Sequence, residues 1–245
     1  MFKIIYGIHT INEVYKINPD ILICVYLFKK NNSSRLKKLL IKIYKKGIKI
    51  KLNNNKFILN KINKKLHQGI FALIKNIKQN NENDLLNILK KRKKNIILVL
   101  DGIKDPHNLG ACLRSAEAAG VNIVIIPKNR SSPINSTVEK VSSGSIYNLK
   151  IIKVINISRT LILLKKNNIY IIGSVINSKN NIFNIKISGS LALVVGSEDK
   201  GLRKLTKKNC DILVSIPMLG FISSLNVSVA TGILLFEIIR KRIYN

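Results

Sequence analysis

The segment IILVLDGIKDPHNLGACLRSAEAAGVNIVIIP, residues 96–127, decides the fold class of this chain. It opens with IILVLD (96–101), an apolar run of the length of a buried strand, and residues 122–126 form a second such run. Between the two, residues 108–119 read as a helix that ends at Gly120. A strand, a helix and a strand in this order predict an α/β unit in which the two strands lie parallel.

The same alternation continues to the C-terminus. Further strands are predicted at residues 149–155, 169–175, 191–195 and 212–216, and helices at residues 135–141, 158–166 and 224–242. This order predicts a mostly parallel sheet with helices on both faces. Ligands of such sheets bind beyond the carboxyl ends of the strands, so the loops after Asp101, Val195 and Ile216 are the places to look for a site.

The N-terminal third predicts a smaller α/β unit. Residues 20–28 and 69–74 read as buried strands, and leucines at helical spacing between them predict a helix that ends at Gly47. The following stretch is polar and basic, with one helical piece at 84–92 and the run KKRKK at 90–94, which we interpret as a solvated linker or helix end. The predicted organisation is an N-terminal domain (1–74), a basic linker (75–94) and a larger domain (95–245).

Composition narrows the class of protein. A chain of 245 residues with a hydrophobic fraction of 46% can bury a proper core, which excludes a disordered protein. Lys and Arg outnumber Asp and Glu by 43 to 12, and a formal charge of +31 favours a polyanionic partner such as nucleic acid. The chain holds 44 Ile, 35 Lys and 30 Asn, all residues with AT-rich codons, so part of the charge reflects mutational bias.

Several classes of site and location are disfavoured. The three cysteines and three histidines are scattered without a CxxC pair or metal-ligand spacing, so we expect no disulfide framework, no metal and a reducing cytoplasm. The N-terminus lacks the apolar core of a signal peptide. Residues 212–236 carry no charge, but Pro217, Asn226 and two glycines interrupt them, so we expect no membrane span.

The first of the three loops is DGIKDPHNLGACLRSAEAAG (101–120). Asn108 is placed to cap the helix, and capping alone would explain it. Arg114 is a lone arginine among small residues near the start of the helix, where its rigid fork of donors suits a phosphate or carboxylate. An ordinary structural ion pair explains Arg114 equally well.

The second and third loops also place polar groups beside apolar strands. In LALVVGSEDKGLRKL (191–205), Gly196 permits close approach of a ligand to the backbone, and Glu198 can accept hydrogen bonds or merely favour a helix N-terminus. The spacing fits neither a dinucleotide fingerprint nor a P-loop, which argues against a dehydrogenase. In IPMLGFISSLNVSVATGILLFE (216–237), capping explains one of Ser224 and Asn226 but not the cluster.

Together and in this order, the three loops closely resemble the motifs of the SpoU/TrmH branch of the SPOUT RNA methyltransferases. YGIH (6–9) and LHQGI (66–70) extend the resemblance to the N-terminal domain, so it covers essentially the whole chain. The resemblance implies transfer of a methyl group from S-adenosyl-L-methionine to a ribose 2′-hydroxyl, with no metal. The substrate that it implies is a guanosine in the peptidyl-transferase P loop of large-subunit ribosomal RNA.

The resemblance also implies architecture. Family members have a catalytic domain whose C-terminal segment forms a trefoil knot, an N-terminal L30e/L7Ae-like RNA-binding domain, and a homodimer that completes the active site. Matched motif by motif, the catalytic residues would be Asn108, Arg114, Glu198, Ser224 and Asn226. The cofactor would lie against Gly196, Ile216 and Leu225, with Val195 and Met218 as neighbours. Phe221, Ile222, Asp199 and Lys200 depart from the pattern without touching a polar motif residue.

Two other readings stay open. The chain could be a catalytically idle RNA-binding or ribosome-assembly protein that kept the fold, although all five polar motif residues are present. It could also methylate a transfer RNA, as other members of the branch do. The N-terminal domain with its two motifs favours ribosomal RNA.

Overall fold

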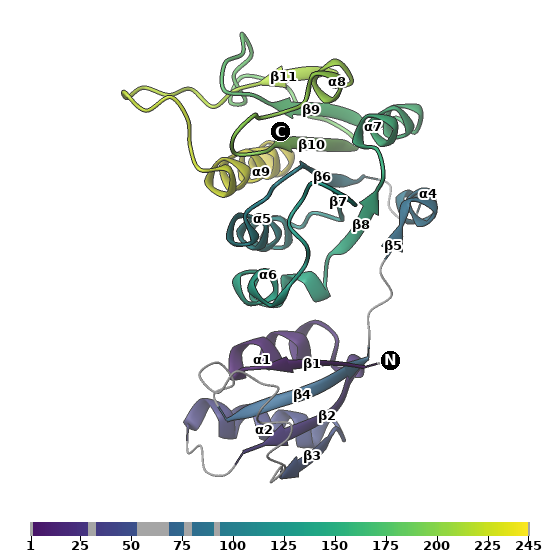
Figure 1. Cartoon of the computed structure of the whole chain (residues 1–245), viewed down its shortest axis with the longest axis vertical. Coiled ribbons are helices and arrows are strands. Elements are labelled where there is room, and N and C mark those ends of the chain that lie inside the picture. Colours follow the sequence, from purple (N-terminus) through teal and green to yellow (C-terminus); the bar gives the residue numbers. More distant parts are fainter. Residues whose placement is uncertain (1, 29–32, 53–68, 76–79, 91–93, 245) are drawn as a thin grey trace. The chain divides into compact units, whose positions relative to one another are not determined.

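The computed structural model describes residues 2–28, 33–52, 69–75, 80–90 and 94–244. The chain divides into two compact units (Figure 1). The first comprises residues 1–78 with 143–148, and the second comprises 79–142 with 149–245. Residues 66–68 of LHQGI and 91–93 of KKRKK lie outside the described residues.

The first unit is a four-stranded sheet with helices. Its elements are β1 (Phe2–Tyr6), α1 (Ile8–Ile17), η1 (Pro19–Ile21), β2 (Leu22–Leu27), α2 (Ser34–Lys45), β3 (Lys49–Leu52), β4 (Ile70–Lys75) and η3 (Ser145–Tyr147). The strand order is β1-β4-β2-β3, with β4 antiparallel to both neighbours and β2 parallel to β3. The apolar faces of α1 and α2 supply Ile11, Val14 and Ile43 to its core. The predicted small α/β unit is therefore confirmed.

The second unit is built on seven strands in the order β11-β9-β10-β6-β7-β8-β5. They are β5 (Asn80–Asn81), β6 (Ile96–Asp101), β7 (Ile123–Pro127), β8 (Lys150–Val154), β9 (Tyr170–Ser174), β10 (Leu191–Gly196) and β11 (Ile212–Val214). All the pairings that join these strands are parallel, which confirms the α/β fold with a mostly parallel sheet. The expected trefoil knot stays a prediction.

Helices cover both faces of this sheet. They are η2 (Glu82–Asp84), α4 (Leu85–Leu89), α5 (Pro106–Ala118), α6 (Ser136–Val141), α7 (Ile157–Lys166), α8 (Lys204–Lys208) and α9 (Val227–Tyr244). Alternate residues of β6, Ile97 and Val99, pack in one core cluster with α4 and α7. Figure 1 shows α5, α6 and α9 on the opposite side of the sheet. The central strands are buried on both faces, which explains their continuous apolar runs.

Part of the segment predicted as a linker belongs to this core. Within residues 75–94, β5 pairs with β8 at the edge of the sheet, and Leu85 and Leu89 of α4 are buried. The helical piece predicted at 84–92 therefore exists as the shorter helix α4, and it docks on the sheet instead of lying in a solvated linker.

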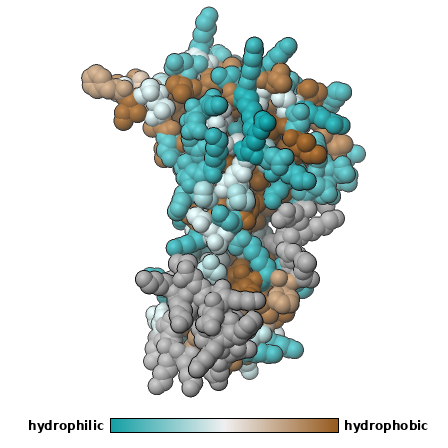
Figure 2. Space-filling view, in the orientation of Figure 1, coloured by the Kyte–Doolittle hydropathy of each residue, from teal (hydrophilic) through white to brown (hydrophobic). Residues whose placement is uncertain are grey.

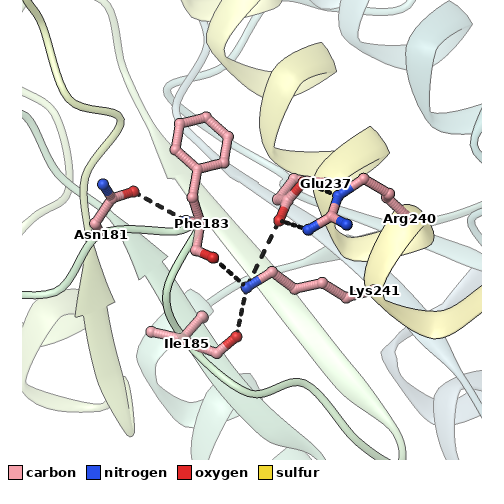
Figure 3. A network of polar contacts seen from close by, with 6 residues as sticks. All are labelled: Asn181, Phe183, Ile185, Glu237, Arg240 and Lys241. Atoms are coloured by element: carbon pink, nitrogen blue, oxygen red, sulfur yellow. Dashed lines mark hydrogen bonds and ion pairs between the residues drawn. The ribbon is translucent and has the colours of Figure 1, made fainter. Parts of the chain in front are cut away.

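The last helix is tied to the segment between β9 and β10 through a buried lysine (Figure 3). The Lys241 Nζ atom donates hydrogen bonds to the carbonyls of Phe183 (2.9 Å) and Ile185 (2.6 Å) and lies 3.6 Å from the Glu237 carboxylate. Hydrogen bonds from Arg240 hold the pKa of the Glu237 carboxyl below its ordinary value. Residues 183–185 are therefore fixed to α9, although they form no helix or strand.

Candidate functional site

A cavity of about 730 Å³ lies at the carboxyl edge of the large sheet. It is bounded by the segments that follow β9, β10 and β11 and by the first turn of α5, because parallel strands bring these loops to one edge. Its walls include all five residues predicted to hold a cofactor: Val195, Gly196, Ile216, Met218 and Leu225. Four of the five predicted catalytic residues also line it: Asn108, Glu198, Ser224 and Asn226.

The helix after the first loop is capped by Asp105, not by Asn108. The Asp105 carboxylate accepts hydrogen bonds from the backbone N–H groups of His107 (3.0 Å) and Asn108 (3.3 Å), and Pro106 occupies the first helical position. The prediction that Asn108 caps the helix is therefore wrong. An aspartate directly before a proline takes the capping position, which leaves the Asn108 side chain free for other contacts.

The side chain of Asn108 contacts both other motif loops, through Glu198 of the second and Asn226 of the third. Its Nδ2 atom donates to the Glu198 carboxylate at 2.9 Å, and its Oδ1 atom accepts from the Asn226 amide at 3.0 Å. The three residues stand 90 and 118 positions apart in the chain, so only the folded sheet brings them together. The side chains form a polar chain along one wall of the cavity.

The third loop ends where Asn226 caps α9. The Asn226 Oδ1 atom accepts hydrogen bonds from the Ser228 N–H at 2.9 Å and the Ser228 hydroxyl at 2.6 Å. The helix therefore begins at Val227, and the predicted start at residue 224 was three residues early because an apolar-rich pattern ran through the cap. Capping accounts for Asn226, while Ser224 remains outside the helix and lines the cavity.

Gly196 provides room for the protein itself. A Cβ atom at this position would lie 2.1 Å from the Gly201 carbonyl carbon and 2.2 Å from the Leu202 nitrogen. The absence of a side chain lets the second loop fold back, with paired hydrogen bonds between Ser197 and Gly201. The close approach expected for a ligand is therefore made by this turn. Glu198 stands in the turn, six residues before α8, so the helix dipole does not explain it.

Arg114 is the predicted catalytic residue that this chain does not bring to the cavity. It is the ninth of the thirteen residues of α5, not near its start, and its side chain is exposed. Within the described part of the chain it has no ion pair, so the structural ion-pair explanation finds no partner.

Sequence analysis missed one wall of the cavity. It is lined by Ser174, the last residue of β9, and by Val175, Ile176 and Asn177, which follow the strand. The signal was available, because a strand was predicted at 169–175 and its carboxyl end had to meet the others at the same edge. The residues themselves carry no recognisable motif, so no local pattern distinguishes them from an ordinary loop.

A buried thiol, that of Cys112, lies near the cavity. Burial raises the pKa of the Cys112 thiol, on the inner side of α5, to about 12, so it stays protonated and is no nucleophile at neutral pH. Among the described residues, no three His, Cys, Asp or Glu side chains gather in a way that could hold a metal ion. In the same described residues, no helix has the length and apolar character needed to cross a membrane.

Comparison with known proteins gives consistent matches over both units. The model of the SpoU rRNA Methylase family matches residues 95–236, and a model described as RNA 2′-O ribose methyltransferase substrate binding matches residues 4–80. A protein of Blochmanniella floridana named 23S rRNA (guanosine-2′-O-)-methyltransferase RlmB is 49% identical, over 100% of this chain and 97% of that protein. The protein of the same name from Escherichia coli K12 is 43% identical, over 99% and 100%.

Solved structures agree with the fold. The SpoU methyltransferase AviRb from Streptomyces viridochromogenes, determined in complex with the cofactor AdoMet, has a TM-score of 0.78 at 21% identity and covers 100% of this chain and 92% of that one. The structure described as A. aeolicus TrmH/SpoU tRNA modifying enzyme is 32% identical with a TM-score of 0.57. It covers 66% of this chain and 82% of that one.

Proposed function

The chain belongs to the SpoU rRNA methylase family, and from that premise we propose that it methylates the ribose 2′-hydroxyl of a guanosine in large-subunit (23S) ribosomal RNA, with S-adenosyl-L-methionine as methyl donor. The observation that carries the proposal is the Asn108 bridge between Glu198 and Asn226 on the wall of the cavity. Three loops that are distant in sequence converge there on one site.

The cavity suits the proposed cofactor. Its volume of about 730 Å³ falls in the range of small-molecule sites, and its walls combine apolar side chains with backbone and a few polar groups. Val195, Ile216 and Leu225 would pack against the adenosine, and Gly196 and Met218 would border it. When bound, S-adenosyl-L-methionine supplies an activated methyl group, so the reaction needs no metal.

The residues of this chain have to align the ribose hydroxyl and help it lose a proton. Asn108 would hold Glu198 and Asn226 in fixed positions around the target nucleoside, with Ser224 beside them. We assign Arg114 the role of clamping an RNA phosphate and orienting the hydroxyl. A guanidinium group stays protonated in proteins and does not accept a further proton, so the phosphate or water takes the proton of the hydroxyl.

We further propose that the working form is a homodimer and that Arg114 acts on the cavity of the partner. Arg114 is exposed and outside the cavity of its own chain. The loop between β11 and α9 projects from the unit with apolar side chains on its surface (Figures 1 and 2). Leu219, Phe221 and Ile222 of this loop are at least 74% exposed. A second copy of the chain would bury these apolar side chains.

Ribosomal RNA is favoured over transfer RNA because relatives named for 23S rRNA align with the whole chain, N-terminal unit included. The tRNA enzyme from A. aeolicus covers 66% of it. We propose that residues 1–74 bind the RNA substrate, that 95–245 carry out the transfer, and that the protein works in the cytoplasm, where ribosomal RNA is found.

The deciding experiment combines purified protein, ribosomal RNA that lacks the modification, and methyl-labelled S-adenosyl-L-methionine. Nuclease digestion then maps the label. A single 2′-O-methylguanosine in the P loop is the expected result. No transfer with normal cofactor binding would point to another RNA, and no transfer without cofactor binding would favour an idle RNA-binding protein.

A further inference from the structure

A second cavity, of about 490 Å³, lies at the same edge of the large sheet. It is formed by the loop after β7, the start of α7 and residues 203–206. The segment that follows β10 separates it from the cofactor cavity, since residues 196–202 line the first cavity and residues 203–206 line the second. The two cavities are therefore neighbours across one stretch of chain.

The second cavity is cationic. Arg130, Arg203 and Lys204 line it, and among its lining residues there is no Asp or Glu. The first turn of α7, Ile157 and Ser158, adds the positive end of a helix to the same walls. Such a set of donors suits an anion with several oxygen atoms.

Arg203 and the backbone of Arg130 both lie beside Gly102. A Cβ atom at Gly102 (φ +92°) would lie 3.1 Å from Arg203 Nη2 and 3.3 Å from the Arg130 carbonyl oxygen. Arg203 is anchored by the fully buried carboxylate of Asp101, 3.5 Å from its Nε atom. Arg130 has a φ of 62°, a left-handed backbone that non-glycine residues rarely adopt. The guanidinium of Arg203 is therefore anchored at the wall of the cavity.

We propose that this second cavity binds a phosphate of the RNA backbone next to the nucleotide being methylated. The proposal rests on the proposed function and adds a contact to it. Exposed apolar side chains of Ile155 and Leu205 border the cationic groups, which suits the sugar and base of a nucleotide better than a free ion. The segment of residues 196–206 borders both cavities, so a phosphate bound in the second would lie close to the nucleotide being methylated at the first.

The test uses the full-length double variant Arg130→Gln, Lys204→Gln, leaving Arg203 in place so that Asp101 keeps its partner. Its matched control is Lys150→Gln, Lys166→Gln, which removes the same charge at the start of β8 and the end of α7, away from this edge. Binding of a ribosomal RNA fragment is measured by filter retention over a range of salt concentrations. This measurement does not depend on methyl transfer, and cofactor affinity is measured separately by calorimetry.

If both side chains contact single-stranded RNA, the slope of log affinity against log salt falls by about 1.4, and affinity at physiological salt falls about tenfold. The control pair changes both less, and cofactor affinity stays as in the wild type. Wild-type affinity and slope in the Arg130, Lys204 variant would overturn the proposal, as would equal losses in the control. Absence of methyl transfer by the wild-type protein would instead count against the proposed function, and the binding comparison would still judge the cavity.

Discussion

The side-chain amide of Asn226 donates a hydrogen bond to the Oδ1 atom of Asn108 at 3.0 Å, which joins the cap of the last helix to the first turn of α5. Asn226 is at the same time the residue that ends the third loop and starts α9. The position of the C-terminal helix is therefore coupled directly to the geometry of the cavity wall.

Replacing Asn108 tests this coupling. Asn108→Asp keeps the acceptor for Asn226 but sets a carboxylate against Glu198, so we expect turnover to fall at neutral pH at least as much as in Asn108→Ala. Repulsion raises the pKa of one of the two carboxyls, and its protonation restores a donor. Turnover of Asn108→Asp should therefore recover as the pH is lowered, measured as kcat against pH. A pH profile parallel to that of Asn108→Ala would contradict the bridge.

Arg114→Ala should lower kcat by about 10²-fold or more, since it removes a group that positions the reacting hydroxyl. Cofactor affinity should stay nearly unchanged, because Arg114 does not line the cavity. Methyl transfer and calorimetric titration with S-adenosyl-L-methionine give the two values. Lys166→Ala, an exposed cation at the end of α7, is the control. Equal losses of turnover and cofactor affinity would mean that Arg114 is structural.

Mixing subunits tests whether Arg114 acts across a dimer. Arg114→Ala and Asn226→Ala homodimers are each expected to be nearly inactive. In a mixed dimer, one site combines an intact cavity with an intact Arg114, so re-equilibrated equal mixtures should regain about a quarter of wild-type activity. The measurement is methyl transfer before and after dissociation and reassembly. No recovery in verified mixed dimers would show that Arg114 serves its own chain.

Lys241→Met should destabilise the protein by about 3 kcal/mol, because it removes a buried charge and leaves the Phe183 and Ile185 carbonyls without their donor. Arg240→Met is the matched control. Its side chain is 56% exposed, so the loss of unfolding free energy there should be much smaller than in Lys241→Met. Urea unfolding measures both. Similar losses of unfolding free energy in the two variants would contradict the larger contribution that we assign to the buried Lys241.

Alkaline pH should weaken the fold through its buried thiols. Burial raises the pKa of Cys112 from 9.0 to about 12 and that of Cys210 from 9.0 to about 11. Above pH 9 the unfolded chain therefore releases protons that the folded chain keeps, so the stability that these thiols contribute is complete below pH 9 and lost as pH rises toward 11 and 12. Cys112→Ala should flatten the fall in unfolding free energy between pH 9 and 11. An unchanged slope would contradict this assignment.

The sequence predicted the fold because strong apolar runs dominate its pattern. β6 spans the predicted residues 96–101, and the parallel alternation is confirmed. Predictions for single polar residues were less accurate. Either Asp105 or Asn108 could cap α5 by its propensity, and the structure shows that Asp105 does so. The space at Gly196 is filled by the turn at Gly201 and Leu202, which the local sequence does not reveal. The assigned catalytic roles stay predictions.

The remaining gaps have a physical cause. Ser174–Asn177 line the cavity because β9 lies beside β10 in the sheet. This order of strands cannot be predicted from the local sequence. The second, cationic cavity also arises from contacts between segments about 75 residues apart, so its arginines looked like part of a general excess of charge.

The placement of residues 216–230 in the cavity wall has a consequence for synthesis of the protein. A nascent chain presents the Asn108 and Glu198 loops long before the residues that close the cofactor site have left the ribosome. A premature stop before Ile216 removes that wall together with α9. Under the proposed function, such truncated products lack residues that would hold the methyl donor, so we expect a cell that makes them to gain incomplete chains without stray methylation.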